Sequence, residues 1–346
     1  MDLERIAVVG TGSWGTTLAA MLARQGLPVT LWVREEAEAR ELCLRRENRR
    51  FIPGLIFPEG LEVTSYLEEA VGGCHFLFMV VPAQTMRANL RRVKPHLRPG
   101  TIVVSAAKGL EIETTLRMSQ VIEEELGTGF PICALSGPNL AREIAAGLPS
   151  GTVVASLDGE AAQQVQRVVM SPHFRVYTHD DVIGVELGGA LKNIIAIGAG
   201  AADEFGYGDN AKAAFMTRGL AEIARLGVAA GANPLTFAGL AGVGDLVCTC
   251  FSRLSRNHYV GEELAKGRSL QDIRASMRMV AEGIDTTKAA CKMARQYGVE
   301  MPIAAEMYQV LFEGKDPHQA MRSFFTRHPK RELEGPLEEW LRGIRA

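Results

Sequence analysis

The stretch Ile6-Ala7-Val8-Val9-Gly10-Thr11-Gly12-Ser13-Trp14-Gly15 decides the fold that the sequence predicts. Four apolar residues typical of a buried strand run into glycines spaced as G-x-G-x-x-G, and a helical pattern follows. Gly10 permits a tight turn, Gly12 lets the backbone approach a pyrophosphate, and Gly15 allows close packing of helix on strand. Free N–H groups at the helix start would bind the phosphates. The alternative is a glycine-rich turn without a ligand. The glycine motif follows the first strand of a chain in which strands and helices alternate, and this position favours dinucleotide binding.

Outward from this loop, short apolar runs alternate with helical patterns through the first half of the chain. Strands are expected at residues 6–9, 29–33, 76–81, 102–105, 132–135 and 152–155, and helices at 15–25, 35–45, 84–93 and 114–126. Nearly continuous apolar strands that alternate with helices are typical of a parallel sheet covered on both faces. The sequence therefore predicts an α/β N-terminal domain with a Rossmann-type, doubly wound sheet.

From about residue 180 this alternation stops and only helical patterns remain. They cover residues 182–204, 211–226, 256–265, 285–297 and 303–312. We therefore expect a dinucleotide-binding domain over 1–180 and an all-α domain over 181–346 that carries the substrate and catalytic groups.

Composition excludes several classes of protein. The 346 residues carry a formal net charge of -2 and are 47% hydrophobic, so no long-range positive field attracts nucleic acid. Six cysteines without a CxxC pair argue against a metal or disulfide framework and fit the cytoplasm. The N-terminus lacks a signal segment, and the apolar stretch 183–202 carries Glu186 and Lys192, so we expect a buried helix and no membrane span. The apolar helical domain makes a homodimer plausible.

The end of the second expected strand bears on the choice of cofactor. Sites selective for NAD usually place Asp or Glu there to bind the ribose 2′-hydroxyl, whereas this chain has Arg34. A cation at this position predicts use of NADP, alone or beside NAD. The alternative is an ordinary exposed arginine, and the neighbouring Glu35 and Glu36 weaken the charge argument.

Two segments that follow expected strands place polar groups where open α/β sheets bind ligands. Lys108 follows the strand that ends at Ser105, and Ser136-Gly137-Pro138-Asn139 follows the next strand. The second segment is expected to begin a helix with Pro138 in its first turn. Together they could present a lysine and a helix N-terminus to one anion.

Two segments of the helical half carry candidate chemistry. Lys192 lies in a helix that is apolar almost all round, and burial would lower the pKa of its amine as a general base requires. The alternative is a lysine paired with a carboxylate for structure alone. Asp245 follows a glycine-rich turn, and Ser255-Arg256-Asn257 at a helix start offers a fixed positive fork suited to phosphate. The alternative there is an N-capped surface helix, and Cys248 and Cys250 are interpreted as packing residues.

In this order, the segments resemble the bacterial NAD(P)-dependent glycerol-3-phosphate dehydrogenases over nearly the whole chain. The similar stretches are GTGSWGTTLA at 10–19, NRRFIPG at 48–54, VPAQTMR at 81–87, AAKGLE at 106–111, SGPNLA at 136–141, ELGGALKN at 186–193, YGDNAKAAFMTRGLAE at 207–222, AGVGDLVCTC at 241–250, SRN at 255–257 and AEGIDTT at 281–287.

The resemblance implies a reaction and roles for individual residues. The reaction is the interconversion of dihydroxyacetone phosphate and glycerol-3-phosphate with NAD or NADP, supplying glycerophospholipid synthesis. Lys192 matches the catalytic proton acceptor and Asp245 a residue of the substrate site. Positions that hold the substrate match Lys108, Gly137, Ser255, Arg256 and Asn257. Positions that line the cofactor match Ser13, Trp14, Arg34, Phe51, Lys108, Ala141, Arg256, Val280 and Glu282.

Two residues depart from the family pattern. Phe51 stands where Tyr is frequent, which removes one hydroxyl, and Asn139 stands where these enzymes usually have Ser or Thr. Asn can still donate hydrogen bonds, so we expect it to contribute to substrate binding with altered local geometry. Two rival functions remain. A two-domain dehydrogenase acting on a hydroxy acid, a sugar acid or an imine fits the phosphate-binding cluster at 255–257 less well. A non-catalytic dinucleotide sensor would need neither Lys192 nor Asp245.

Overall fold

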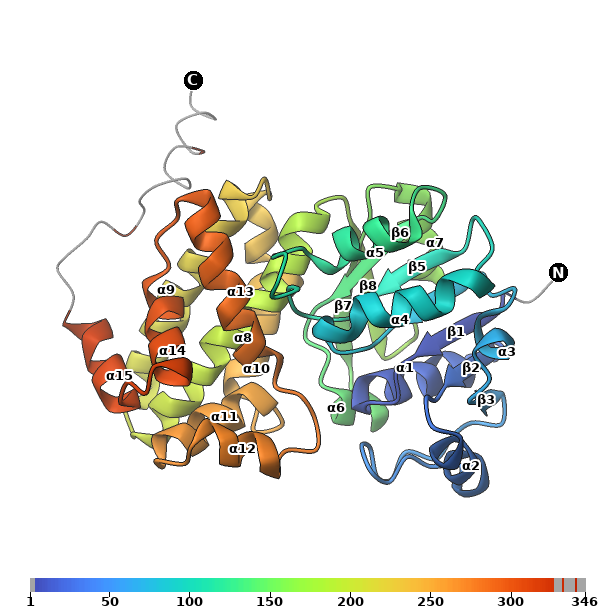
Figure 1. Ribbon diagram of the computed structural model, residues 1–346, viewed down its shortest axis with the longest axis horizontal. Coiled ribbons are helices and arrows are strands. Elements are labelled where there is room, and N and C mark those ends of the chain that lie inside the picture. Colours follow the sequence, from blue (N-terminus) through green and yellow to red (C-terminus); the bar gives the residue numbers. More distant parts are fainter. Residues whose placement is uncertain (1–3, 327–331, 333–339, 341–346) are drawn as a thin grey trace. The chain divides into compact units, whose positions relative to one another are not determined.

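The computed structural model describes residues 4–326, 332 and 340, and the chain divides into two compact units (Figure 1). The first unit holds the residues up to Ala107 together with Met118–Val182. The second holds Lys108–Arg117 and the residues from Ile183 onward. The chain thus enters the second unit at Lys108, returns at Met118 and enters again at Ile183. The outermost parts of the two expected domains, 1–3 and most of 327–346, lie outside the described residues.

The first unit is built on an eight-stranded sheet with the order β3-β2-β1-β4-β5-β6-β7-β8. This order reverses beside β1, which makes the sheet doubly wound and confirms the predicted Rossmann-type fold. The strands are β1 (Ile6–Val9), β2 (Val29–Trp32), β3 (Leu61–Thr64), β4 (Phe76–Met79), β5 (Ile102–Ser105), β6 (Ile132–Ser136), β7 (Ser150–Ala155) and β8 (Phe174–His179).

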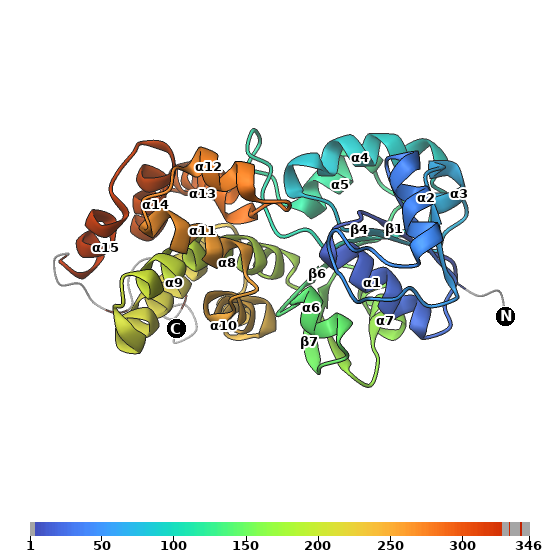
Figure 2. The same ribbon diagram turned by 90° about the horizontal axis from the view of Figure 1, so that it is seen from below.

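Helices cover both faces of this sheet, with α4 and α5 on one side and α1 and α7 on the other (Figure 2). Strands β1, β2, β4 and β5 are buried at every position, which explains why their sequences are apolar without alternation. The helices are α1 (Ser13–Arg24), α2 (Glu36–Arg45), α3 (Leu67–Val71), α4 (Met86–Val93), α5 (Met118–Leu126), α6 (Ala141–Ala145) and α7 (Gly159–Val169).

Two details of the first unit differ from the prediction. The sheet is not wholly parallel, because β7 pairs antiparallel with β6. The connection between them contains only α6, and five helical residues rise roughly 7.5 Å, too little to return along the sheet for a parallel pairing. Pro138 also lies before the helix and not in its first turn, since α6 begins at Ala141 with Leu140 as its N-cap.

The second unit is helical and is organised around α8. Although α8 is long and apolar enough to cross a membrane by composition, 94% of its most apolar window is buried inside the protein. Its elements are α8 (Val182–Glu204), α9 (Gly208–Ala229), the 3-10 helix η3 (Pro234–Ala238), the π-helical turn η4 (Leu240–Gly244), α10 (Asp245–Phe251), α11 (Arg256–Ala265), α12 (Leu270–Ser276), α13 (Glu282–Tyr297), α14 (Pro302–Phe312) and α15 (Pro317–Phe325).

Glycines let α11 approach α8 at backbone contact. A Cβ on Gly261 would overlap the Ile197 carbonyl oxygen, and one on Gly200 would overlap the His258 carbonyl oxygen. No other residue fits at either position without moving a helix. This close crossing places the N-terminus of α11 beside the middle of α8, where Lys192 lies.

Candidate functional site

In the first unit, the three glycines of the loop between β1 and α1 have different surroundings. Gly10 has a φ of 126°, and a Cβ there would overlap the Val80 carbonyl oxygen. A Cβ on Gly15 would overlap the Gly10 carbonyl oxygen, whereas one on Gly12 would meet nothing within 4 Å. Gly10 and Gly15 therefore permit close packing, and Gly12 leaves open space at the start of α1. These residues fit a bound pyrophosphate.

A buried asparagine fixes the segment 48–54 against this loop. Asn48, which is 1% exposed, donates from Nδ2 to the Thr11 carbonyl oxygen and to Thr16 Oγ1, both at 2.9 Å. Ser13 Oγ donates to the Phe51 carbonyl oxygen at 2.7 Å. The structure therefore brings Ser13 and Phe51, two residues predicted to contact the cofactor, together at the start of α1.

Two further predicted cofactor residues lie on other elements of the first unit. Arg34 follows β2, is exposed, and donates from Nη2 to Asn89 Oδ1 at 3.3 Å. Ala141 begins α6, and its carbonyl oxygen accepts from Thr17 Oγ1 of α1 at 3.4 Å. An exposed guanidinium at the end of β2 is sterically able to meet a phosphate on the ribose.

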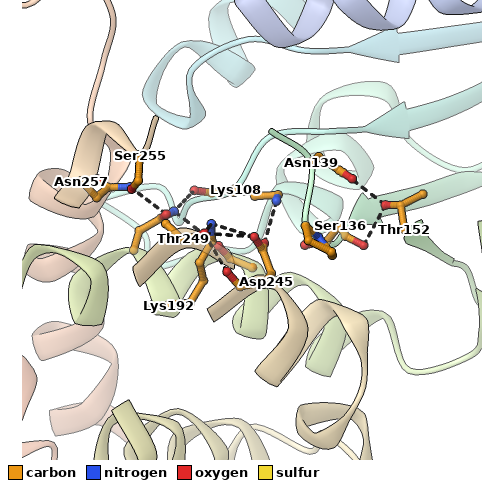
Figure 3. Close-up of polar contacts among 12 residues, drawn as sticks. Lys108, Ser136, Asn139, Thr152, Lys192, Asp245, Thr249, Ser255 and Asn257 are labelled. Atoms are coloured by element: carbon orange, nitrogen blue, oxygen red, sulfur yellow. Dashed lines mark hydrogen bonds and ion pairs between the residues drawn. The ribbon is translucent and has the colours of Figure 1, made fainter. Parts of the chain in front are cut away.

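The segment 136–139 lies against β7 at the carboxyl end of β6 (Figure 3). Gly137 has a φ of 152°, and a Cβ there would lie 2.9 Å from Thr152 Cα. Thr152 Oγ1 donates to the Ser136 carbonyl oxygen at 3.0 Å and lies 3.2 Å from Asn139 Nδ2. Ser136 Oγ and Asn139 Oδ1 are buried without a hydrogen-bond partner among the described residues. A ligand with hydrogen-bonding groups would satisfy them.

In the second unit, one carboxylate lies between two amines, a group that we term the Lys–Asp–Lys cluster (Figure 3). Asp245 Oδ2 lies 2.6 Å from Lys108 Nζ, and Asp245 Oδ1 lies 2.9 Å from Lys192 Nζ. The side chains are 2%, 17% and 6% exposed, respectively. The structure thus brings together three residues that are far apart in the sequence and that the sequence analysis selected separately.

Helix α10 positions the carboxylate and one partner of Lys192. Asp245 is the first residue of α10 and directly follows the π-helical turn η4. One turn later, Thr249 Oγ1 lies 2.5 Å from Lys192 Nζ and 2.7 Å from the Asp245 carbonyl oxygen. The turn before α10 packs closely on α8, because a Cβ on Gly188 would lie 2.6 Å from the Ala241 carbonyl oxygen. Lys192 is therefore held by two groups of one helix.

Burial and charge shift the proton equilibria in the cluster. Burial lowers the pKa of the Lys108 amine to about 8, although the negative charge of Asp245 opposes that shift. Burial would raise the pKa of Asp245, but the positive charges of Lys108 and Lys192 outweigh it and hold that pKa below its usual range. When both amines are protonated, the cluster carries one net positive charge and attracts an anion.

The N-terminus of α11 carries the predicted phosphate-binding residues. Ser255 caps the helix, since its Oγ accepts from the His258 N–H at 3.2 Å. Arg256 is exposed and donates from Nη1 to the Val280 carbonyl oxygen at 2.7 Å, next to Glu282 at the start of α13. Asn257 is buried, with Nδ2 2.8 Å from Asn193 Oδ1 and Oδ1 accepting from the Gly283 N–H at 3.0 Å.

Comparison with known proteins assigns the chain to a family. Residues 5–162 match the model of the NAD-dependent glycerol-3-phosphate dehydrogenase N-terminus, and residues 181–322 match that of its C-terminus. The chain belongs to the NAD-dependent glycerol-3-phosphate dehydrogenase family.

Several known proteins are similar to this chain over nearly its full length. A glycerol-3-phosphate dehydrogenase [NAD(P)+] of Geobacter metallireducens is 51% identical over 331 residues, 95% of this chain and 99% of the relative. One from Dehalococcoides mccartyi is 50% identical over 96% of this chain and 94% of the relative. The crystal structure of glycerol-3-phosphate dehydrogenase from Coxiella burnetii is 36% identical with a TM-score of 0.90, covering 94% of this chain and 99% of that one.

As a member of this family, the chain is an oxidoreductase, and its Rossmann-type domain binds NAD or NADP. Among residues 4–326, 332 and 340, no group of three or more His, Cys, Asp or Glu side chains could hold a metal ion. The predicted roles of individual residues stay predictions.

Sequence reasoning missed several residues that shape this dehydrogenase's site. Thr249 follows Asp245 by four residues, a spacing that places both on one helix face, so the pattern could have indicated it. Asn193, next to Lys192, holds Asn257 and contacts the Lys108 carbonyl oxygen at 3.4 Å. Nothing in the local sequence around Lys108 indicates that residues 108–117 join the helical unit.

Proposed function

We propose that the chain interconverts dihydroxyacetone phosphate and sn-glycerol-3-phosphate, with Lys192 as the general acid and base. The observation that carries this proposal is the buried Lys192 amine, held within hydrogen-bonding distance of both Asp245 and Thr249. A buried amine with a carboxylate partner can exchange one proton with a substrate oxygen while its position stays fixed.

The chemistry requires a proton to move at the C2 oxygen of the substrate. When bound, the nicotinamide supplies hydride transfer at C2. In the oxidation direction, the neutral Lys192 amine removes the proton from the C2 hydroxyl; in reduction, the Lys192 ammonium delivers it to the C2 carbonyl oxygen. Proton transfer by a positioned group typically contributes about 10²–10⁴-fold in rate.

The other two members of the Lys–Asp–Lys cluster have distinct proposed roles. Asp245 orients the amine and stabilises its ammonium form, as the carboxylate of a pair does. Lys108 supplies a second amine on the same carboxylate. Its positive charge is proposed to stabilise the negative charge that develops on the substrate oxygen. Both roles depend on exclusion of water, and the low exposure of the cluster supports them.

The phosphate of the substrate is proposed to bind at the N-terminus of α11. The Arg256 guanidinium is a rigid planar donor, and Ser255 and Asn257 flank it on the same turn. Binding energy gained at the phosphate fixes C2 for reaction. In the first unit, Gly137 and Asn139 are proposed to contact the substrate, which the unsatisfied Ser136 Oγ and Asn139 Oδ1 support.

The cofactor is proposed to bind at the glycine loop, with Arg34 at the 2′-phosphate of NADP. Open space at Gly12 and the fixed positions of Ser13 and Phe51 support this site. For the others the support is family membership. These are Trp14, Lys108, Ala141, Arg256, Val280 and Glu282.

We infer the cellular role from the family resemblance. The enzyme would reduce dihydroxyacetone phosphate in the cytoplasm to supply glycerophospholipid synthesis, and it would act on a small phosphorylated triose without a nucleic-acid partner. The apolar helical unit would support a homodimer.

A steady-state assay with dihydroxyacetone phosphate and either NADPH or NADH tests the proposed reaction. We expect oxidation of the reduced cofactor that depends on the triose phosphate. A parallel panel of a keto acid, a sugar acid and an imine serves as the control. Turnover of one of those substrates and none of the triose phosphate would overturn the proposal.

A further inference from the structure

Of the three members of the Lys–Asp–Lys cluster, two are carried by helices and Lys108 is carried by a loop. We call this loop, Lys108–Arg117, the strap. It leaves the sheet after β5, belongs to the helical unit, and returns to the first unit at α5. A side chain on a loop keeps a fixed position only if other contacts hold the loop. The contacts of the strap therefore determine the position of Lys108.

The body of the strap is ordered by its own pairing and by burial. Leu110 and Arg117 form an antiparallel bridge, and the Glu111 N–H donates to the Leu116 carbonyl oxygen at 3.0 Å. Leu110 is fully buried in the hydrophobic core of the helical unit. The strap is therefore a short hairpin that packs as part of this unit.

Helix α13 holds the tip of the hairpin. Thr115 Oγ1 lies 2.9 Å from Gln296 Oε1, and Lys292 Nζ donates to the Glu113 carbonyl oxygen. Thr115 has a φ of 65°, a left-handed conformation that a β-branched residue rarely adopts. Such a conformation persists only where the surroundings fix it, and this indicates that the strap is held in a single arrangement.

The far end of the strap is fixed to α8 by a buried ion pair. Arg117 Nη1 lies 2.5 Å from Glu186 Oε2, and the two side chains are 14% and 7% exposed. Glu186 lies on the same helix as Lys192. The strap thus reaches the cluster through Lys108 at its first residue and contacts α8 through Arg117 at its last.

We propose that the Arg117–Glu186 pair is a latch that holds the strap and so positions the Lys108 amine on Asp245. Arg117 is a positioning residue, because it acts through Lys108. The importance of the latch for catalysis rests on the proposed function of the cluster, but its effect on Lys108 does not.

The test removes both charges of the latch together, through the double variant Arg117→Met/Glu186→Gln. The control is Lys315→Met/Glu306→Gln, which removes a partly buried ion pair of the same unit that lies outside the strap. Arg117→Lys keeps the positive charge but loses the planar guanidinium, which can donate two hydrogen bonds to one carboxylate. It is the milder variant to use if the double variant does not fold.

The first readout is the rate at which each lysine is acetylated in the ligand-free protein, followed by mass spectrometry. We expect the double variant to label Lys108 about tenfold faster than the parent, through local opening of the strap. Lys212, a buried lysine of α9 paired with Asp203, reports on the rest of the unit and should label at the parental rate. Arg117→Lys should give an intermediate rate, and the control should match the parent.

An unchanged Lys108 rate in the folded double variant, or in Arg117→Lys if the double variant does not fold, would overturn the latch. So would an equal increase at Lys108 and Lys212, which would mean that the whole unit loosens. The second readout is turnover of dihydroxyacetone phosphate. We expect kcat to fall about tenfold in the double variant, whereas Arg117→Lys should keep most of the parental kcat. An unchanged kcat would overturn the catalytic importance of the latch, whereas a parent without turnover would contradict the proposed function alone.

Discussion

Asp245 accepts hydrogen bonds from two amines while only 2% of its side chain is exposed. Removing a carboxylate from water is costly, and a single buried pair often contributes little net stability. Here the carboxylate leaves one positive charge in excess when both lysines are protonated. That excess suits a site that must bind an anion and move a proton more than it suits a structural ion pair.

The pKa of Lys108 predicts a pH dependence of substrate binding. Below about pH 8 the amine is charged, and above it the cluster loses one positive charge. The substrate phosphate stays a dianion across this range, because its second pKa is about 6. We therefore expect the KM for dihydroxyacetone phosphate to rise between pH 7 and about 9.5 in the parent. The KM of Lys108→Met, measured over the same range, should be higher at pH 7 and should lack this rise.

The same shift has a consequence for folding, with a definite sign. The pKa of Lys108 in the folded protein lies below that of an ordinary lysine, so between about pH 8 and 10.5 the unfolded chain binds more protons. The contribution of Lys108 to the free energy of unfolding therefore rises through this window. This pH dependence is opposite in sign to that of a lysine whose pKa is raised by an ion-pair partner on folding.

Arg34 is predicted to determine the preference for NADP. Arg34→Ala should weaken NADPH binding by about 1.5–3 kcal/mol, the range of hydrogen bonds to charged groups, because the 2′-phosphate loses its cation. NADH lacks this phosphate and serves as the control ligand. Titration calorimetry with both cofactors measures the two affinities, and equal losses for NADPH and NADH would contradict the assignment.

At the scale of elements, strands buried on both faces of the sheet could be predicted from the sequence, and the edge strands could not. Strands β1 and β5 have the predicted bounds because every residue in them is buried and apolar. Strands β3 and β8 form the two edges of the sheet, and both were missed. Leu61–Thr64 is short and includes Glu62, while Phe174–His179 alternates buried and exposed residues, so neither gives a continuous apolar signal.

The residues of the candidate site could be selected from the sequence, but the contacts between them could not be predicted. Lys192 stands out because it interrupts an apolar helix, and Asp245 because it follows a glycine-rich turn. The ion pair between Lys108 and Asp245 joins residues 137 positions apart. Only the path of the strap into the helical unit brings Lys108 there, and that path depends on Leu110, Thr115 and Arg117. Local periodicity carries no information on such tertiary contacts.

The crossing of α8 and α11 yields a prediction at the same scale. Gly261→Ala should lower the free energy of unfolding by about 1–3 kcal/mol, because the added Cβ overlaps the Ile197 carbonyl oxygen and forces the helices apart. Denaturant unfolding measures the change. Gly159→Ala is the control, since a Cβ there meets nothing within 4 Å, and its free energy of unfolding should stay within about 0.5 kcal/mol of the parent. Equal losses in both variants would contradict the close-crossing account.

At the scale of the molecule, each of the two units has its own hydrophobic core. The core of the first unit supports the sheet and the glycine loop, and the core of the second surrounds α8. With a net charge of -2, the chain as a whole does not attract anions. Binding of phosphate groups is therefore predicted to depend on local features, namely helix N-termini, Arg34, Arg256 and the Lys–Asp–Lys cluster.

Cofactor binding and proton transfer are predicted to be separable by a single substitution, Lys192→Met. In Lys192→Met, Asp245 keeps its pair with Lys108, so we expect the fold to persist. NADPH at about 100 times its Kd should stabilise parent and variant equally, by about 2.7 kcal/mol. Thermal unfolding with and without NADPH measures this property, and loss of the stabilisation would show that Lys192 serves cofactor binding.

The most direct test of the central claim is the rate of a single turnover in Lys192→Met. Enzyme in excess over NADPH is mixed with saturating dihydroxyacetone phosphate, so that each cofactor molecule is oxidised once, and this oxidation is followed by absorbance. The account predicts a rate about 10²–10⁴-fold below that of the parent, because the positioned proton donor is gone. A variant that oxidises NADPH as fast as the parent would contradict it.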